Sequence, residues 1–206
     1  MRWLAETRFL AHHLCVTETG DWRKARWEAT HRRIFTCALA LFQDFGFEQV
    51  SVGQIAARAK VSVPTFYAHF PSKEHLIMAL PTPEQISALI AGQPAELTMA
   101  ERLRRAVPRF IAAMPPDEHE EMAARWRIIA DTPALRIRAA EFERTTAGMF
   151  LDSLPGVTGA APAHADVVQA GAYLAAYTAA LLTWADSKGR RKLDELIDEA
   201  FRALGG

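Results

Sequence analysis

The sequence VSVGQIAARAKVSVPTFYAHFPSKEHL, residues 50–76, decides the fold because it contains three helix starts in quick succession. Ser51 and Gln54 have the spacing of a capping box, in which the Ser hydroxyl accepts from a free amide and the Gln side chain reaches back to the Ser amide. Ser62 repeats the cap, and Pro64 falls in the first turn of the next helix, where a missing amide hydrogen costs little. The pattern therefore predicts two short helices joined by a tight turn.

The two predicted helices, near residues 52–59 and 63–69, have the arrangement of a helix-turn-helix. The apolar residues expected to face inward are Ile55, Ala56, Ala59, Val61 and Phe66. The second helix is too short to be stable alone, so packing must hold it, and its outward side chains are free for another purpose. These outward side chains, with a lysine that follows the helix, are Val63, Pro64, Thr65, Tyr67, His69 and Lys73. Such donors, cations and small apolar groups are the set that contacts phosphates and base edges.

The run TFYAHFPSKEHL, residues 65–76, together with the apolar spacing that precedes it from Ile34, resembles the DNA-binding domain of TetR/AcrR-family transcriptional regulators. The resemblance covers about residues 27–80. Lys60 departs from it, because the family usually has glycine at this point of the turn. A non-glycine residue can adopt a positive φ at some cost, so the fold expectation is unchanged.

The resemblance implies a role in DNA binding for eight residues. Those that it places on phosphates are Tyr67, His69 and Lys73, with Thr65 on a phosphate or a base. Those that it places on base edges, thymine methyl groups or the opposite edge of the groove are Val63, Pro64, Ser51 and Gly53. Gly53 offers no side chain where relatives often have a base reader. For each of the eight, the alternative is a role in capping or packing.

Charge is distributed unevenly along the chain. The 206 residues are 50% hydrophobic, with a formal net charge of +0 and a pI of about 7.1, which fits one large domain or two small ones. Between Trp22 and His75, however, eight residues are basic and four are acidic. Three of the basic residues, Arg23, Lys24 and Arg26, precede the resemblance; they could contact phosphate or a minor groove, or lie at a solvated helix start. This asymmetry is expected of a nucleic-acid-binding head on a neutral body.

Several other classes of protein are disfavoured. Two cysteines, Cys15 and Cys37, form no disulfide framework, no apolar run is expected to span a membrane, and charged residues interrupt any secretory signal. We therefore expect a cytoplasmic protein. Motifs such as GxSxG, a Gly-rich phosphate loop and HExxH are absent, so no enzyme is predicted. His12, His13 and Cys15 are too few to predict a metal site, and no cofactor is expected.

The chain divides into an N-terminal extension (1–22), a helix-turn-helix DNA-binding domain (23–72) and a ligand-binding and dimerisation domain (73–206). In the extension Trp3, Thr7, Leu10 and Leu14 would suit a short amphipathic helix, while a mobile arm or a misassigned start are the alternatives. A long helix is expected from Asp21 or Arg26 to Phe45, ended by Gly46. A third helix is expected from residue 73, with Ser72 as its cap and a break at Pro81 and Pro83.

The remaining segments read as amphipathic helices, and no strand pattern competes, so the chain is predicted to be all-α. Thr98 and Glu101 form another capping box, and Pro108 lies inside the helix that follows. The last two helices, over about residues 167–185 and 193–204, have clear apolar stripes, and the first is rich in alanine. The family resemblance implies that these two helices form a four-helix bundle with a second subunit, giving a homodimer.

An apolar ligand pocket is predicted in the body, where aromatic residues and methionines gather on the middle helices. The candidates are Phe110, Met114, Met122, Trp126, Phe142 and Met149. For any one of them a place in the core is the alternative. The segment from Arg125 to Arg138 is also similar to a subgroup of TetR-like proteins thought to bind acyl-CoA-like ligands, whose phosphates the arginines would suit; solvated surface arginines are the alternative.

The sequence therefore predicts a homodimeric repressor that a small apolar or acyl-CoA-like effector releases from palindromic double-stranded DNA. Its recognition helices would enter successive major grooves roughly 34–36 Å apart. The effector would favour a conformer in which the heads are wrongly spaced. One alternative is a constitutive DNA-binding protein with a closed core and no effector. Another is a helical module that has lost DNA binding.

Overall fold

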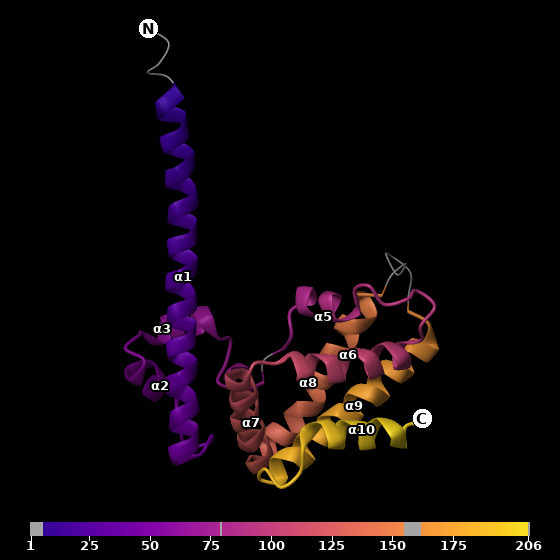
Figure 1. Ribbon diagram of the computed structural model, residues 1–206. Coiled ribbons are helices and arrows are strands. Elements are labelled where there is room, and N and C mark those ends of the chain that lie inside the picture. Colours follow the sequence, from indigo (N-terminus) through magenta and orange to yellow (C-terminus); the bar gives the residue numbers. More distant parts are fainter. Residues whose placement is uncertain (1–5, 79, 155–161, 206) are drawn as a thin grey trace.

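The computed structural model is all-α over the residues that it describes, which are 6–78, 80–154 and 162–205, with side chains described from Trp22 onward (Figure 1). This confirms the predicted fold class. The helices are α1 (Glu6–Phe45), α2 (Val52–Arg58), α3 (Val63–His69), α4 (Glu74–Ile77), α5 (Pro83–Ile90), α6 (Met99–Ala113), α7 (Pro116–Asp131), α8 (Pro133–Asp152), α9 (His164–Asp186) and α10 (Leu193–Ala203).

Helix α1 is one continuous helix of 40 residues, and it begins well before the predicted start at Asp21 or Arg26. Figure 1 shows its N-terminal half continuing past α2 and α3, away from the rest of the molecule. The side chains of the expected amphipathic face (Trp3, Thr7, Leu10 and Leu14) and of His12, His13 and Cys15 lie outside the described residues. Gly46 follows α1 with a φ of 82°, as the predicted C-cap requires.

The helix-turn-helix forms where it was predicted, and its local devices are confirmed. The Ser51 hydroxyl accepts from the amide of Gln54 at 3.2 Å, while the Gln54 side chain accepts from the amide of Ser51 at 2.7 Å. Ser62 caps α3 by accepting from the amide of Thr65 at 3.1 Å. Lys60 has a φ of 53° in the turn between the helices, which is the left-handed conformation that glycine would adopt more easily.

The connector after the helix-turn-helix differs from the expectation. Ser72 is not the helix cap that was predicted, since Lys73 precedes α4 and the Ser72 hydroxyl donates instead to Oε2 of Glu74 at 2.6 Å. The chain breaks after α4, and Pro83 opens α5 rather than kinking it. Thr82 caps α5 with a full capping box that was not predicted from the sequence. The connector is therefore two short helices with a break between them.

The body is built around α9, which packs against α6, α7, α8 and α10. Thr98 caps α6 through its predicted capping box with Glu101, and Pro108 lies inside that helix as expected. By length and composition alone α9 could cross a membrane, contrary to the expectation that no apolar run was long enough. The core helix of a soluble protein can have the same length and apolar composition. Because α9 packs against four other helices, it is such a core helix in this structure.

Two apolar cores join where the head meets the body. The core of the head, built on α1–α4, includes Ile128 and Ile129 of α7 and Leu135 and Ala139 of α8. The core of the body is formed by α5–α10, and Trp126 packs against both. The orientation of the helix-turn-helix is therefore fixed by side chains of α7 and α8.

Candidate nucleic-acid interface

Helix α3 presents an exposed face that no other described element covers. The Phe66 side chain of this helix is fully buried and anchors it to the head. By contrast, Val63 and Tyr67 are 40% and 52% exposed, and Pro64 is also exposed. Thr65 is half-buried, and its hydroxyl lies 2.7 Å from that of Ser62. The structure thus places five predicted contact residues, these four and His69, on one short helix, and it leaves Val63, Pro64 and Tyr67 open to a partner.

The start of α2 carries the other two predicted contact residues that are exposed. Ser51 is exposed even though its hydroxyl serves the helix cap. Gly53 is exposed as well, and a Cβ atom built there would meet only the Ser51 hydroxyl, at 3.8 Å. A side chain at position 53 would therefore fit, so glycine here keeps the surface flat without any requirement from the fold.

His69, the last residue of α3, belongs to an aromatic cluster that was not predicted from the sequence. Its ring packs against Trp27 of α1 at a tilt of 32°, with centroids 4.8 Å apart, and lies 5.7 Å from the ring of His31. The His31 ring in turn stacks on Phe70 at 4.1 Å. In both histidines Nδ1 is buried and has no hydrogen-bond partner among the described atoms. His69 is therefore a packing residue as well as a candidate phosphate contact.

Both histidines are held in the neutral state by their surroundings. Burial is the main cause that lowers the pKa of His31 below the usual 6.5, and the charges of His69 and Arg125 add to it. Burial also lowers the pKa of His69, with a further contribution from Arg33. Because a charged imidazole is disfavoured in this cluster, the folded head binds fewer protons than the unfolded chain near pH 6.

We expect the protein to lose stability as the pH falls from 7.5 to 5.5. A group whose pKa is lowered on folding stabilises the fold fully above its unfolded pKa, about 6.5 for histidine, and this contribution is lost as the pH falls toward the folded pKa. Urea unfolding at a series of pH values measures the effect. The variant His31→Phe, which keeps a ring against Phe70, should show a weaker pH dependence; an unchanged dependence would contradict the assignment.

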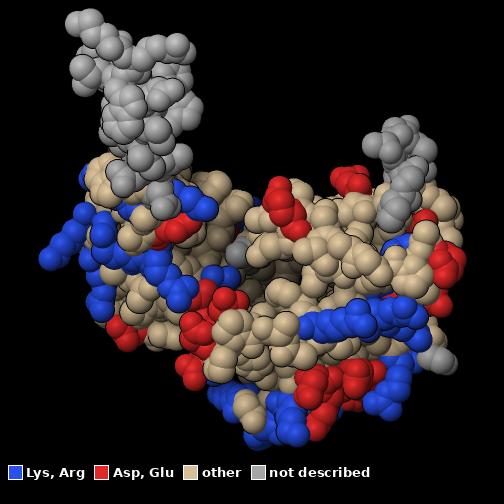
Figure 2. All heavy atoms as spheres, turned by 45° about the horizontal axis from the view of Figure 1, so that its top comes forward, with Lys and Arg blue, Asp and Glu red and all other residues tan. Residues whose placement is uncertain are grey.

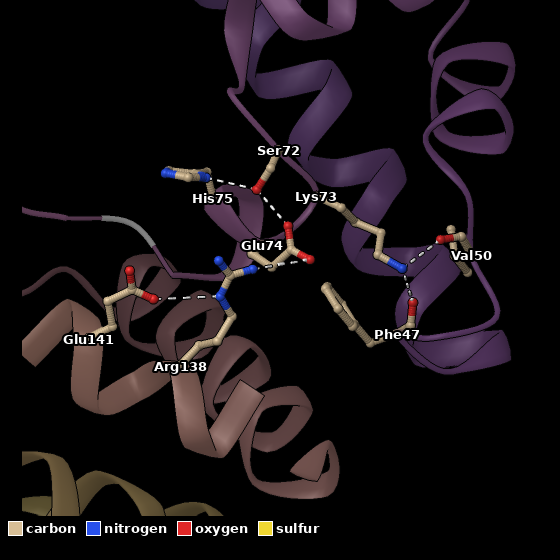
Figure 3. Close-up of polar contacts among 8 residues, drawn as sticks. All are labelled: Phe47, Val50, Ser72, Lys73, Glu74, His75, Arg138 and Glu141. Carbon is tan, nitrogen blue, oxygen red and sulfur yellow. Dashed lines mark hydrogen bonds and ion pairs between the residues drawn. The ribbon is translucent and has the colours of Figure 1, made fainter. Parts of the chain in front are cut away.

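Lys73 directs its ammonium group into the head (Figure 3). Nζ donates to the carbonyl oxygens of Phe47 at 2.8 Å and Val50 at 2.9 Å, and it lies 4.2 Å from the centroid of the Phe47 ring. Partial burial lowers the pKa of Lys73. Two of the three ammonium donors are therefore used within the protein, which ties the turn before α2 to the start of α4 and leaves one donor for a phosphate.

Two sets of ion pairs join the head to the body. Glu121 of α7 accepts from Arg32 of α1 at 2.9 Å and from Arg125 at 2.6 Å, and the Arg125 guanidinium lies 4.4 Å from the Phe35 ring of α1. Figure 3 shows the second set, in which Arg138 of α8 lies 3.7 Å from Glu74 of α4. A movement of α7 or α8 would therefore be transmitted directly to the helix-turn-helix.

The six predicted ligand residues are not gathered around one cavity. Met122 and Met149 pack on the body core, Phe142 packs on the head core, and Phe110 is 40% exposed. Trp126 lies between the two cores, and Met114 caps the C-terminus of α6. Their spacing identified apolar helix faces, but it did not distinguish a face toward a cavity from one toward a neighbouring helix.

Two open grooves lie elsewhere, one at the seam of head and body and one beside α10. Their volumes are about 500 Å³ and about 1020 Å³. Both are lined by Gln43, Ala124 and Arg127, and none of the six predicted ligand residues lines either. Within the described residues, Arg127 makes no hydrogen bond or ion pair, whereas Arg125, Arg136 and Arg138 are all paired. Of the four arginines between Arg125 and Arg138, Arg127 is thus the one without a partner among the described residues.

Basic side chains collect on the head. Figure 2 shows Lys and Arg side chains gathered on the flank of the molecule below the projecting N-terminal segment. The exposed basic residues of this part of the chain include Arg23, Lys24, Arg26, Arg58 and Lys60. A basic surface beside an exposed short helix suits the phosphate backbone of nucleic acid.

Two family models match the chain. Residues 34–80 match bacterial regulatory proteins of the tetR family, and residues 97–206, more than half of the chain, match the MftR C-terminal domain. The chain is 38% identical over 58 residues to the A-factor receptor protein of Streptomyces griseus, which covers 28% of this chain and 21% of that protein. It is 33% identical over 88 residues to the repressor KstR of Mycolicibacterium smegmatis, covering 38% of this chain and 43% of that one. The chain therefore spans less than half of the length of these relatives.

Solved structures share the fold at low sequence identity. NalD, the secondary repressor of a multidrug efflux pump in Pseudomonas aeruginosa, aligns with a TM-score of 0.51 and 23% identity over 85% of this chain and 95% of that one. FadR of Bacillus halodurans aligns with a TM-score of 0.51 and 17% identity over 85% and 98%. At these identities the likeness supports the fold alone. Together with the helix-turn-helix and the two family matches, it shows that the chain belongs to the tetR family of bacterial regulatory proteins, and so is a DNA-binding transcriptional regulator with an MftR-type C-terminal domain and not an enzyme.

Proposed function

We propose that the protein is a homodimeric repressor that inserts α3 into the major groove of a palindromic operator. One observation carries the proposal: α3 is capped by Ser62 and anchored by the buried Phe66, while Val63, Pro64 and Tyr67 stay exposed. A seven-residue helix is not stable alone, so packing against the rest of the head must hold α3 in place. Because its outer face is left exposed, we infer that this face binds a partner. We assign the DNA-binding function to residues 23–72. Because bacterial DNA lies in the cytoplasm, we also propose that the protein acts there.

The contact residues divide by their chemistry. The hydroxyl groups of Tyr67 and Thr65 suit phosphates, and Val63 and Pro64 suit base edges and thymine methyl groups. Ser51 and Gly53, at the start of α2, would meet the opposite edge of the groove. His69 and Lys73 would contribute less, because the His69 ring is packed on Trp27 and Lys73 has one free donor. Few of these side chains can hydrogen-bond a base edge, so sequence selection would rest on few direct contacts.

The dimer would form through α9 and α10, within residues 73–206. The outward face of α9 carries small and apolar residues at helical spacing: Val168, Ala172, Ala175 and Ala179. Val168 is 55% exposed, and Ala175 and Ala179 are also exposed in the single chain. Two such faces could approach closely across a two-fold axis. A two-fold dimer would then set the recognition helices roughly 34–36 Å apart, one turn of DNA.

A small apolar or acyl-CoA-like effector is the proposed signal for release. The partly buried apolar side chains between the two cores and the unpaired Arg127 support this class of ligand. The ion pairs of Glu121 with Arg32 and of Glu74 with Arg138 would carry a shift of α7 or α8 to the head. An effector acts only to the extent that it binds the released conformer better than the DNA-bound one.

A constitutive DNA-binding protein is the second candidate. The observation that favours it is that none of the six predicted ligand residues lines either groove. This candidate keeps the DNA-binding head and the dimer but predicts no release by a ligand. Titration of the DNA complex with palmitoyl-CoA separates the two: release of the DNA supports the effector, whereas binding that ignores this ligand keeps the constitutive candidate in place.

Replacing Tyr67 with Ala is expected to weaken DNA binding about tenfold or more, since a hydrogen bond to a charged group contributes about 1.5–3 kcal/mol. Fluorescence anisotropy of duplexes selected by the wild-type protein from a random library measures the affinity. Tyr67→Phe removes the hydroxyl alone and should account for most of the loss. The control is Phe45→Ala, which truncates an aromatic residue that is 63% exposed at the far end of α1. Equal affinities of wild type and Tyr67→Ala on every duplex would contradict the proposed interface.

A further inference from the structure

The part of α1 that precedes the family match carries exposed aromatic and basic side chains together. The match to the tetR family begins at residue 34, yet Trp22 and Trp27 lie on earlier turns of α1 and are 60% and 49% exposed. The Arg26 guanidinium lies 5.5 Å from the centroid of the Trp22 ring, within the range of a cation–π contact. Single exposed aromatic side chains are common on protein surfaces, so it is the basic side chains beside these two that indicate a partner.

This segment lies directly against the end of the recognition helix. The Trp27 ring packs against the ring of His69, the last residue of α3, with centroids 4.8 Å apart. Arg23 lies four residues before Trp27, so it occupies the same face of α1 one turn farther out. Figure 1 shows α1 continuing in this direction beyond α2 and α3. Side chains of α1 that lie N-terminal to Trp27, such as that of Arg23, are therefore positioned beside the partner that α3 contacts.

The dimensions of DNA put phosphates at that position. A helix of seven residues is about 10 Å long, and the major groove of B-DNA is about 12 Å wide. When α3 lies in the groove, the phosphates that border the groove stand just beyond the ends of the helix. A residue on α1 next to the C-terminal end of α3 would then face one of these phosphate strands.

The charges of this segment match that partner. Lys24 lies 4.0 Å from Glu28, but Arg23 and Arg26 are exposed and have no acidic partner among the side chains that the structure describes. A guanidinium group can bind a phosphate through two parallel hydrogen bonds. The contact between Arg26 and the Trp22 ring keeps the guanidinium group on the exposed surface of α1, where a phosphate can reach it.

We propose that Arg23 and Arg26, the latter supported by Trp22, form a second DNA-contact site on α1. This site binds the phosphate backbone beside the groove that α3 enters and lengthens the footprint beyond the helix-turn-helix. It contributes affinity on every sequence and adds no base selection, because phosphates carry no sequence information. The proposal rests on the proposed function, since α3 must occupy a major groove for α1 to meet the flanking strand.

The test is the salt dependence of DNA binding by the double variant Arg23→Gln/Arg26→Gln. Each subunit of the proposed dimer carries both arginines, so the double variant loses four phosphate contacts. At about 0.9 for each contact, its slope of log affinity against log salt should be smaller by about 3.6. At 0.15 M salt the affinity should fall roughly a hundredfold to a thousandfold, on a selected duplex and on an arbitrary 40-bp duplex alike. The matched control is Arg105→Gln/Arg109→Gln, which removes two exposed arginines from α6 in the body and should leave the slope unchanged.

The outcomes separate this proposal from the proposed function. If the wild type binds DNA but the double variant has the slope and affinity of its control, the α1 site is overturned and the helix-turn-helix assignment stands. If the wild type binds neither duplex, the proposed function itself fails. Hydroxyl-radical footprinting gives a second readout: the double variant should lose protection at the flanks while keeping it in the groove that α3 occupies.

Discussion

Replacing Lys73 with Met is expected to lower the free energy of unfolding by about 2 kcal/mol. The ammonium group donates to the carbonyl oxygens of Phe47 and Val50, and charged hydrogen bonds contribute about 1.5–3 kcal/mol each when well buried. Lys73 is only half-buried, so water can replace part of these interactions, and the expected value lies below the sum of the two. Methionine keeps the stem of the side chain and removes only the charged donor. Urea unfolding monitored by circular dichroism measures the change.

The control for this variant is Lys24→Met, which removes one charge from the exposed surface of α1 and should change stability by less than about 0.5 kcal/mol. If Lys73→Met behaves like this control, the bonds to Phe47 and Val50 contribute nothing. DNA binding then gives a second distinction. If Lys73 only braces the head, the folded variant keeps the salt slope of the wild type, whereas a lysine that binds a phosphate in each subunit of the dimer gives a slope smaller by about 1.8 when it is replaced.

Prediction from sequence succeeded for features that are decided locally along the chain. The caps at Ser51, Ser62 and Thr98 were predicted correctly because a cap is decided within four residues of chain, where the spacing of hydroxyl, amide and carboxyl groups is visible. The same holds for Lys60, whose place in a tight turn required a positive φ. The helix-turn-helix and its exposed face followed from these local devices and from the apolar spacing between them.

Contacts between distant parts of the chain could not be predicted in this way. The partners of Lys73 lie 26 and 23 residues away, and nothing in the local pattern distinguishes a lysine that reaches a carbonyl from one that reaches a phosphate. Arg102 is another case: no local pattern singles it out, yet it is 2% exposed and donates to the carbonyl oxygens of residues 94, 95 and 97. The contact of Trp27 with His69 likewise depends on how α1 crosses α3.

The position of a ligand cavity also could not be predicted from the apolar pattern of the sequence. A methionine or a phenylalanine at helical spacing faces inward, but inward is toward a neighbouring helix for Met149 and Phe142. The position of a cavity depends on gaps between helices, which are set by the sum of many side chains. The two open grooves are lined partly by polar residues such as Arg127 and Gln43, which an apolar pattern does not select.

Replacing Ala175 with Arg on α9 is expected to convert the protein to monomers and to weaken operator binding at least about a hundredfold. Ala175 is exposed in the middle of the outward face of α9, where a close helix–helix contact has no room for a long charged side chain. A monomer binds one half-site at a time and loses the high effective concentration that the second head has in a dimer, an advantage of about 10²- to 10⁴-fold. Sedimentation velocity should report the mass of one 22.9 kDa chain, and anisotropy on a selected palindrome should report the weakened binding.

The matched control is Ala88→Arg, which places the same side chain on an exposed alanine of α5. This variant should remain dimeric and bind DNA like the wild type, because α5 packs on α6 and α8 rather than on α9. A duplex that carries a single half-site gives an internal test, since the Ala175→Arg monomer should bind it about as well as a single wild-type head does. If Ala175→Arg remains dimeric with full affinity, the outward face of α9 is not the interface. The exposed apolar stripe from Val168 to Ala179 would then require a different partner.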